Sequence, residues 1–378
     1  MLPIIRVASR RVSILEYFVQ STSVAVDMRS SILAIALLAS CAPSRAEAPA
    51  SAPGSRTFRM GFSPIPPRLS TAEVLRTADE MSKHADAALM VLDIPWAALL
   101  ADTSAALLVR RDQLQLARLL TQRGVPLVVQ LEPANGLDRG AEAAVLVKLG
   151  RSITEPAVQR VYREYVAAFD SIVRPDYLLL AVETNLIRAA SKASVYSALV
   201  TMSNAAAAER RAAGSKTKLM VSVQVDVAWG RLPGSNGSFV GIARDRADFP
   251  FVDVLGLSSY PYLAGFKTPE EIPLDYYSRI TADAPLPMIV TEGGWTSGSV
   301  AGVTSSPDVQ ARYIRRQMQL ADQAKLIGVF QITFTDLDVS TFNLPPGSIL
   351  PLFAQLGLVD ANYRAKPALA VWDSVRAR

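Results

Sequence analysis

Two glutamates, Glu183 and Glu292, each stand at the end of a short apolar run with the composition of a buried strand. The run before Glu183 reads YLLLAV, and the run before Glu292 reads MIVT. Two carboxyl groups that flank a glycosidic bond can cleave it: one protonates the leaving oxygen, while the other attacks the anomeric carbon or directs a water molecule. If the fold brings these two run ends together, the pair predicts chemistry on sugars.

The composition leaves few other catalytic groups. The 378-residue chain contains one cysteine, Cys41, and one histidine, His84. This excludes an intrachain disulfide and a zinc site built from His and Cys, and any His-dependent triad would have to use His84. We therefore predict an enzyme with no metal and no other cofactor. The net charge of +5 comes without a basic run of the kind that follows phosphates, so we expect no nucleic-acid partner.

Apolar runs rich in β-branched residues alternate with helical patterns after residue 57. Eight such βα repeats predict a single α/β domain, a (β/α)₈ TIM barrel over residues 58–378. The alternative, an open doubly wound sheet, would usually have a Gly-rich turn after the first strand, whereas this chain has SPIPP at residues 63–67. The predicted strands are Phe58–Ser63, Ala88–Ile94, Pro126–Leu131, Tyr177–Glu183, Lys218–Val227, Val252–Tyr260, Met288–Glu292 and Ile327–Thr335.

Helix signals lie in the gaps between these runs. Ser70 to Glu73 is a capping-box pattern, and Ser306-Pro307 is a typical helix start. Further helices are predicted near residues 102–122, 155–172, 191–213, 268–282 and 366–376.

Side chains alternate between the two faces of a strand, so one set in each strand faces the barrel interior. The helix-facing set should be large and apolar, which predicts Leu178, Leu180 and Val182 outside in the fourth strand. The predicted interior set is polar mainly toward the carboxyl ends of the strands, where barrel enzymes place their sites. Its members are Asp93, Gln130, Glu132, Leu179, Ala181, Glu183, Ser222, Gln224, Asp226, Gly256, Ser258, Tyr260, Met288, Val290, Glu292, Gln331, Thr333 and Thr335.

Four of these polar residues compete with or support the glutamate pair. Glu132 and Asp226 could bind substrate or could themselves be the true acid. Gln130 and Asp93 are predicted to contact substrate.

The layout and local motifs resemble the clan A glycoside hydrolases, retaining barrel enzymes with glutamates at the ends of strands four and seven. Residues 289–297, IVTEGGWTS, are similar to the nucleophile segment of the β-1,3-glucanases of that clan. Residues 259–264, SYPYLA, are similar to a segment of the same enzymes, and endo-β-1,4-galactanases have a comparable one. The later LGLVD and KPA segments, residues 356–360 and 366–368, are also common in the clan.

This resemblance implies a retaining hydrolase of β-linked polysaccharides or oligosaccharides. Glu292 would be the nucleophile, and Glu183 the general acid/base. Tyr260 would hydrogen-bond Glu292, while Trp295 and Trp229 would stack on sugar rings.

Two departures from the clan pattern support a second hypothesis. Val182 stands where the clan usually has an Asn before the acid/base, and Asn185 follows two residues after Glu183, where we predict that it contacts substrate. Strand eight lacks the usual aromatic residue inside the mouth, because Phe334 has the outward parity. The alternative is therefore a catalytically inactive barrel that binds glycans.

The N-terminal region has the features of an export signal. Met28 to Ser31 precede an apolar run that ends in Leu38-Ala39-Ser40-Cys41, similar to a bacterial lipobox. We expect residues 1–27 to lie upstream of the true start, residues 28–41 to be a lipoprotein signal peptide, and Cys41 to be lipidated. Residues 42–57 are rich in Ala, Pro and Ser, which predicts a flexible tether between the membrane and the folded domain. These features predict a monomer in the bacterial cell envelope, in the outer membrane, periplasm or cell surface, held to the membrane through its lipid alone.

Overall fold

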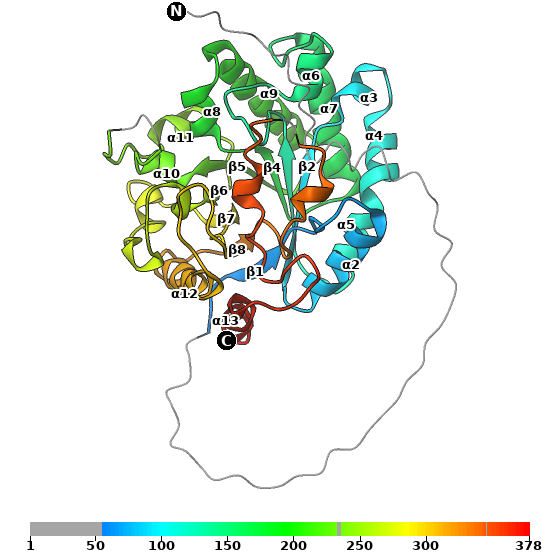
Figure 1. Cartoon of the computed structure of the whole chain (residues 1–378). Coiled ribbons are helices and arrows are strands. Elements are labelled where there is room, and N and C mark those ends of the chain that lie inside the picture. Colours follow the sequence, from blue (N-terminus) through cyan, green and yellow to red (C-terminus); the bar gives the residue numbers. More distant parts are fainter. Residues whose placement is uncertain (1–54, 233–235, 345) are drawn as a thin grey trace, which may run out of the picture.

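The structure, a computed structural model, describes residues 55–232, 236–344 and 346–378. Eight parallel strands form one closed barrel in sequence order, with β8 paired back to β1, and helices surround it (Figure 1). This confirms the predicted (β/α)₈ barrel. The predictions for residues 1–27 and 28–41, and most of the predicted tether 42–57, lie outside the described residues. Within the described part, no helix is long and apolar enough to cross a membrane.

The observed strands lie close to the predicted runs, with two exceptions at the carboxyl ends. β5 stops at Gln224, because Val225–Ala228 forms the short helix α10 and the Gln224 side chain accepts a hydrogen bond from its Val227 N–H. β8 stops at Gln331, four residues before the predicted end. The strands are β1 Arg59–Phe62, β2 Ala87–Asp93, β3 Leu127–Glu132, β4 Tyr177–Ala181, β5 Lys218–Gln224, β6 Val254–Ser259, β7 Met288–Gly293 and β8 Gly328–Gln331.

Both predicted helix starts are confirmed. Ser70 caps α2 by accepting from Glu73 N–H, and Ser306 caps α12 by accepting from Val309 N–H. The helix predicted at 268–282 is wrong: that segment holds only two short 3₁₀ turns, η3 Pro269–Glu271 and η4 Ser278–Thr281. Pro273 between them lacks the N–H that a helix interior needs. The α-helices are α2 Thr71–Ser82, α3 Trp96–Leu100, α4 Ala105–Leu108, α5 Leu114–Thr121, α6 Ala144–Lys148, α7 Pro156–Ile172, α8 Thr184–Ala190, α9 Ala193–Ala212, α10 Val225–Ala228, α11 Ala243–Asp248, α12 Pro307–Gln323 and α13 Pro367–Arg376.

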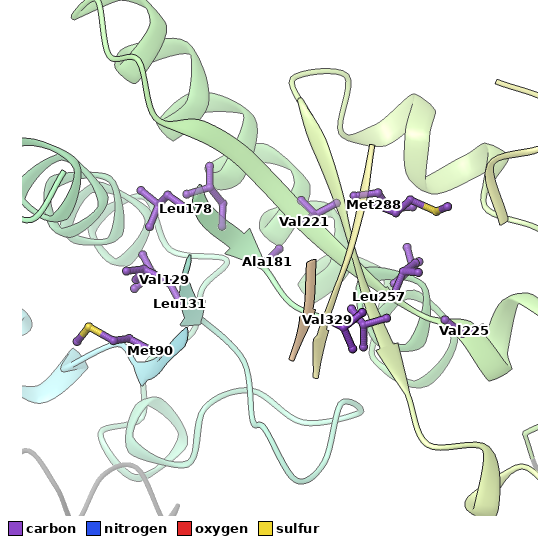
Figure 2. Packing of buried hydrophobic residues seen from close by; sticks show 14 of the residues in the cluster. Met90, Val129, Leu131, Leu178, Ala181, Val221, Val225, Leu257, Met288 and Val329 are labelled. Carbon is purple, nitrogen blue, oxygen red and sulfur yellow. The ribbon is translucent and has the colours of Figure 1, made fainter. Parts of the chain in front are cut away.

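Two hydrophobic cores lie on the two sides of the barrel wall. The larger one joins the outward faces of the strands to the helices, and Figure 2 shows part of it, including Leu178, Val221 and Leu257. The smaller one draws on seven strands and on no helix, so it fills the barrel interior. Its members are Ala87, Leu89, Val91, Val128, Leu179, Val182, Met220, Val254, Ile289 and Phe330.

The alternation rule predicts the interior side correctly for β3, β5 and β6 but fails in β4. Leu180 and Ala181 are consecutive and both belong to the outer core, whereas Val182 belongs to the interior core. The pairing of β4 with β5 shifts register between Leu179 and Ala181, and such a bulge turns every later side chain to the other face. The predictions that Val182 faces the helices and Ala181 the interior are therefore wrong.

The interior predictions for β7 and β8 need the same correction. Met288 and Val290 pack in the outer core and Ile289 in the interior, the reverse of the prediction. In β8, Gln331 points outward, because its Nε2 donates to Gln317 Oε1 on α12 at 2.6 Å. A buried pair of amides between strand and helix breaks the rule that polar residues mark the interior.

Candidate active site

Glu183 reaches the barrel mouth through an unusual backbone conformation. It follows β4 as the N-cap residue of α8, with φ 50° and ψ 48°, in the left-handed region. A residue other than glycine pays about 1–3 kcal/mol for that conformation, so surrounding contacts must hold it. Its N–H donates to Ser222 Oγ at 2.9 Å, and its carbonyl accepts from Ile187 N–H at 3.0 Å. The β4 bulge and this turn together bring the Glu183 side chain to the interior side.

Glu292 reaches the same place through a second register shift. Leu257 of β6 pairs with Val290 of β7, but the next pair is Ser258 with Glu292, so Thr291 is skipped. Glu292 therefore faces the mouth, although the residues before it alternate the other way. Gly293 allows the close approach, because a Cβ there would lie 2.5 Å from the carbonyl oxygen of Ser259. The two glutamates predicted to act together therefore lie at the same place. The register shifts in β4 and β7 and the left-handed turn at Glu183 bring them there, and simple alternation does not predict these features.

One hydroxyl bridges the two carboxyl groups. Ser258 Oγ lies 2.5 Å from Glu183 Oε1 and 2.9 Å from Glu292 Oε1. Ser258 is fully buried, and Glu183 and Glu292 are each 7% exposed. The carboxyl groups therefore share a confined site with little access to bulk water.

An arginine that the sequence predictions missed forms ion pairs with two acidic side chains of the site, Glu183 and Glu132. Arg139, in the loop between β3 and α6, donates from Nε to Glu183 Oε2 at 2.8 Å and from one terminal nitrogen to Glu132 Oε2 at 2.6 Å. Its side chain is 5% exposed. Arg139 lies in a loop outside any periodic pattern, so no alternation or motif in the sequence could have indicated it.

Gln130 joins the third acid to this network. Its Nε2 donates to Glu132 Oε1 at 2.8 Å and to Glu292 Oε2 at 3.1 Å. Gln130 and Glu132 are buried, and Asp93 lies opposite Glu132 in the pairing of β2 with β3. The predicted residues Gln130 and Glu132 therefore contact the glutamate pair or its arginine, and their predicted contact with substrate stays a prediction, as does that of Asp93.

The electrostatics of the site favour a protonated Glu292. Burial raises the pKa of its carboxyl group well above the ordinary 4.5, and the negative charges of Glu183 and then Glu132 raise it further. The charge of Arg139 and the hydrogen bond from Gln130 act in the opposite direction but do not cancel the rise. Burial, and then the charges of Glu292 and Glu183, raise the pKa of the Tyr260 phenol well above 10. Tyr260 is thus a neutral hydroxyl close to both glutamates, while its predicted hydrogen bond to Glu292 stays a prediction.

Three residues predicted to bind sugar have structural partners instead. Asn185 is 1% exposed and exchanges two hydrogen bonds with the backbone of Gln224. Trp295 is completely buried, and its Nε1 donates to Ser305 Oγ, so it offers no face to a sugar ring. Asp226 is completely buried and accepts from Tyr276 and Gln224. The structure thus gives Asn185 and Trp295 packing roles in place of the predicted contact with sugar. In the described part of the chain, no hydrogen bond joins Asp226 to the glutamate pair.

Trp229 is partly exposed but already packed. Its ring stacks on Tyr276 at 5.7 Å between centroids, its Nε1 donates to the Tyr276 carbonyl, and Arg279 lies 5.0 Å from its centroid. One ring face is therefore in use, and sugar stacking by Trp229 stays a prediction. Phe334 packs edge-on against Phe62 in the outer core, which confirms that it does not line the mouth.

No group of three or more His, Cys, Asp and Glu side chains within the described ranges could hold a metal ion. His84 is remote from the glutamates and pairs through Nδ1 with Asp373 on α13. The groups gathered around the glutamate pair are the Glu132 carboxyl group, the hydroxyls of Ser258 and Tyr260, the Gln130 amide and the Arg139 guanidinium.

Comparison with known proteins identifies solved structures with a similar fold but no protein family for the chain. No protein-family model and no curated protein matches the chain. Among solved structures, the chain is similar to an exo-β-1,4-mannosidase from Opitutaceae bacterium strain TAV5, with a TM-score of 0.62 and 17% identity over 86% of this chain. The chain spans 60% of the length of that mannosidase.

Two further structures point to the same fold. A GH5_18 protein from Bifidobacterium longum subsp. longum matches with a TM-score of 0.62 and 14% identity, covering 85% of this chain and 79% of that one. A family 39 glycoside hydrolase from Bacteroides cellulosilyticus WH2 matches with a TM-score of 0.58 and 16% identity, covering 85% and 64%. The chain therefore shares the barrel fold of these glycoside hydrolases, which is the fold that the sequence predicted.

Proposed function

We propose that this protein is a retaining glycoside hydrolase that cleaves β-linked glycans by double displacement, with Glu292 as nucleophile and Glu183 as general acid/base. One observation carries the proposal: a single hydroxyl, Ser258 Oγ, contacts both carboxyl groups. The two bridged oxygens can be no further apart than the 2.5 and 2.9 Å contacts combined. Retaining enzymes hold their carboxyl groups about 5–5.5 Å apart and inverting enzymes about 6.5–9.5 Å, so this spacing supports retention.

The surrounding residues fit the two steps of that reaction. In the first step Glu292 attacks the anomeric carbon while Glu183 gives its proton to the leaving oxygen. In the second step Glu183 takes a proton from water, which then releases the sugar from Glu292. Gln130 orients Glu292 through Oε2, and Arg139 orients Glu183 through Oε2, which leaves the Oε1 atoms of both on the Ser258 side.

The substrate class follows from the site and its neighbours together. The site has three carboxyl groups and one guanidinium, so it suits a neutral sugar better than an acidic one. A variant of the Bifidobacterium GH5_18 protein was solved in complex with Manβ1-4GlcNAc. We therefore place β-linked mannosides first among the substrates to test, followed by β-glucans and galactans.

The test is release of reducing sugar from a panel of these glycans by the purified protein. Glu292→Gln and Glu183→Gln are matched variants, since each replaces a carboxyl group by an amide of the same shape. Loss of activity in both, with an unchanged melting temperature, supports the proposal. Full activity in Glu292→Gln contradicts it.

A second candidate function is glycan binding without turnover. Arg139 holds Glu183, the proposed acid, in a buried ion pair, and Val182 stands where the clan usually has an Asn. Calorimetric binding of Manβ1-4GlcNAc or a β-glycan without new reducing ends supports this candidate, whereas turnover by the wild type excludes it.

We also propose that the protein is a monomeric lipoprotein of the bacterial cell envelope, anchored through Cys41. The lipobox-like LASC sequence and the absence of any other cysteine support this. Incorporation of labelled palmitate into the wild type, and its loss in Cys41→Ser, is the expected result. Equal labelling of both would contradict it.

A further inference from the structure

Ser258 contacts more acceptors than its single proton can serve. Both Glu183 Oε1 and Glu292 Oε1 lie within hydrogen-bond distance of its Oγ. A serine hydroxyl has one O–H to donate and can accept as well. One of the two contacts is therefore a bond in which a protonated carboxyl group donates to Ser258, while Ser258 donates to the other carboxylate.

The charges around the site indicate which carboxyl group holds the proton at rest. Arg139 bonds directly to Glu183 and Glu132, whereas the second oxygen of Glu292 meets only the neutral amide of Gln130. A cation stabilises the carboxylate that it touches. The remaining titratable group, Tyr260 on the β6 side, is a neutral phenol. In the resting protein Glu292 therefore carries the proton and donates it to Ser258, and Ser258 donates to the Glu183 carboxylate.

That resting arrangement is the reverse of the one that double displacement requires. The nucleophile must be ionised and the general acid protonated before the glycosidic bond breaks. Both carboxyl groups are 7% exposed, so exchange of their protons with bulk water is restricted. The buried hydroxyl between them offers a direct internal path.

We propose that Ser258 relays a proton between the two catalytic carboxyl groups. The proton leaves Glu292 Oε1 for Ser258 Oγ as the hydroxyl's own proton passes to Glu183 Oε1. The products are an ionised Glu292, a protonated Glu183 and an unchanged serine, so no proton or charge is gained or lost. This inference rests on the proposed function, and Ser258 acts in it as a positioning residue that works through the two glutamates.

The kinetic test uses Ser258→Ala, with Ser258→Thr as the matched control that keeps the hydroxyl. Two substrates are compared: phenyl β-mannopyranoside, whose leaving group needs acid catalysis, and 2,4-dinitrophenyl β-mannopyranoside, whose leaving group does not. We expect Ser258→Ala to lower kcat on the phenyl substrate about 10²-fold near neutral pH, where Glu292 holds the proton that the relay delivers to Glu183. On the dinitrophenyl substrate its kcat should rise toward the wild-type value as alkaline pH ionises Glu292 without the relay.

The pH profile separates a relay from a merely structural role. A structural serine lowers kcat by the same factor on both substrates at every pH, and that result overturns the proposal. Wild-type activity in Ser258→Ala also overturns it. If the wild type itself turns over neither mannoside, the mannoside hydrolase assignment fails, and the infrared measurement below still decides the role of Ser258.

Infrared difference spectroscopy locates the proton without any substrate. With ¹³C-labelled glutamate, the protonated-carboxyl band of the wild type near neutral pH should disappear in Glu292→Gln. In Glu183→Gln the band should remain but titrate at a lower pH, because the charge of Glu183 raises the pKa of Glu292. In Ser258→Ala the pH at which the band is lost should fall by about one unit, because protonated Glu292 loses its acceptor. A band that disappears in Glu183→Gln instead, or an unchanged titration in Ser258→Ala, contradicts the proposal.

Discussion

Two buried carboxyl clusters near the carboxyl ends of the strands differ in what surrounds them. Asp226 is completely buried, and the neutral donors Tyr276 and Gln224 bond its two oxygens. Glu292 is slightly exposed, and its nearest charged neighbours include two more carboxyl groups. Burial raises the pKa in both, to about 6 for Asp226, but only Glu292 also feels like charges. A perturbed acid thus indicates function when further carboxyl groups and a slight exposure accompany it, and structure when neutral donors enclose it.

The largest expected effect comes from replacing the two glutamates of the proposed active site, Glu292 and Glu183. Glu292→Gln should lower kcat by roughly 10⁴-fold or more, because no nucleophile remains for the first step. Glu183→Gln should lower it by about 10²–10⁴-fold on poor leaving groups and far less on dinitrophenyl glycosides. Steady-state kinetics on both kinds of substrate checks this, and equal losses for both substrates in Glu183→Gln would contradict its role as the acid.

Removal of the arginine should affect stability and pH dependence together. Arg139→Gln leaves Glu132 and Glu183 buried without their cation, which costs about 3–5 kcal/mol of unfolding free energy. It also removes the charge that lowers the pKa of Glu292, so the acidic limb of the pH–rate profile should move to higher pH. Urea unfolding and a pH–kcat/KM profile measure the two effects.

Glu132→Gln is the matched variant, because it removes a negative charge near Glu292, whereas Arg139→Gln removes a positive one. The charge of Glu132 raises the pKa of Glu292, so its removal should move the acidic limb to lower pH, by about one unit or less. Movement of the limb in the same direction for Glu132→Gln and Arg139→Gln would show that these charges do not act on Glu292.

The Asp226 cluster should respond in stability and not in catalysis. Its folded pKa of about 6 lies above the ordinary 3.8, so the folded protein binds the proton more tightly and loses stability as pH rises between these values. The loss amounts to roughly 2–3 kcal/mol. Asp226→Asn should remove this pH dependence while leaving the pH–rate profile unchanged, which thermal unfolding across the acid range and kinetics check. A shift of the pH–rate profile would instead make Asp226 part of the site.

The sequence predicts the barrel well because period-2 apolar runs and helix caps are local signals. Eight runs, the Ser70 and Ser306 caps and the strand-end glutamates can all be read without knowledge of tertiary contacts. The sides of β4 and β7 could not be predicted, because each strand skips one residue in its pairing and local alternation contains no sign of that.

The site was predictable where its residues lie on strands or directly after them. Gln130, Glu132 and Ser258 follow the strand pattern, whereas Arg139 reaches Glu183 from a loop whose path depends on the whole fold. Trp295 belongs to a sugar-enzyme motif by sequence, but the Ser305 bond and complete burial give it a packing role here. Sequence similarity to a motif thus predicts residue types, while burial in the folded chain decides how each of them is used.

The most direct test of the central claim is to trap the covalent intermediate. A 2-deoxy-2-fluoro β-mannoside with a dinitrophenyl leaving group slows both steps, and peptide mass spectrometry then identifies the labelled residue. The account predicts one sugar attached to Glu292 in the wild type and none in Glu292→Gln. A label on Glu183 or Glu132, or turnover of β-mannosides with inverted product and no label, would contradict it.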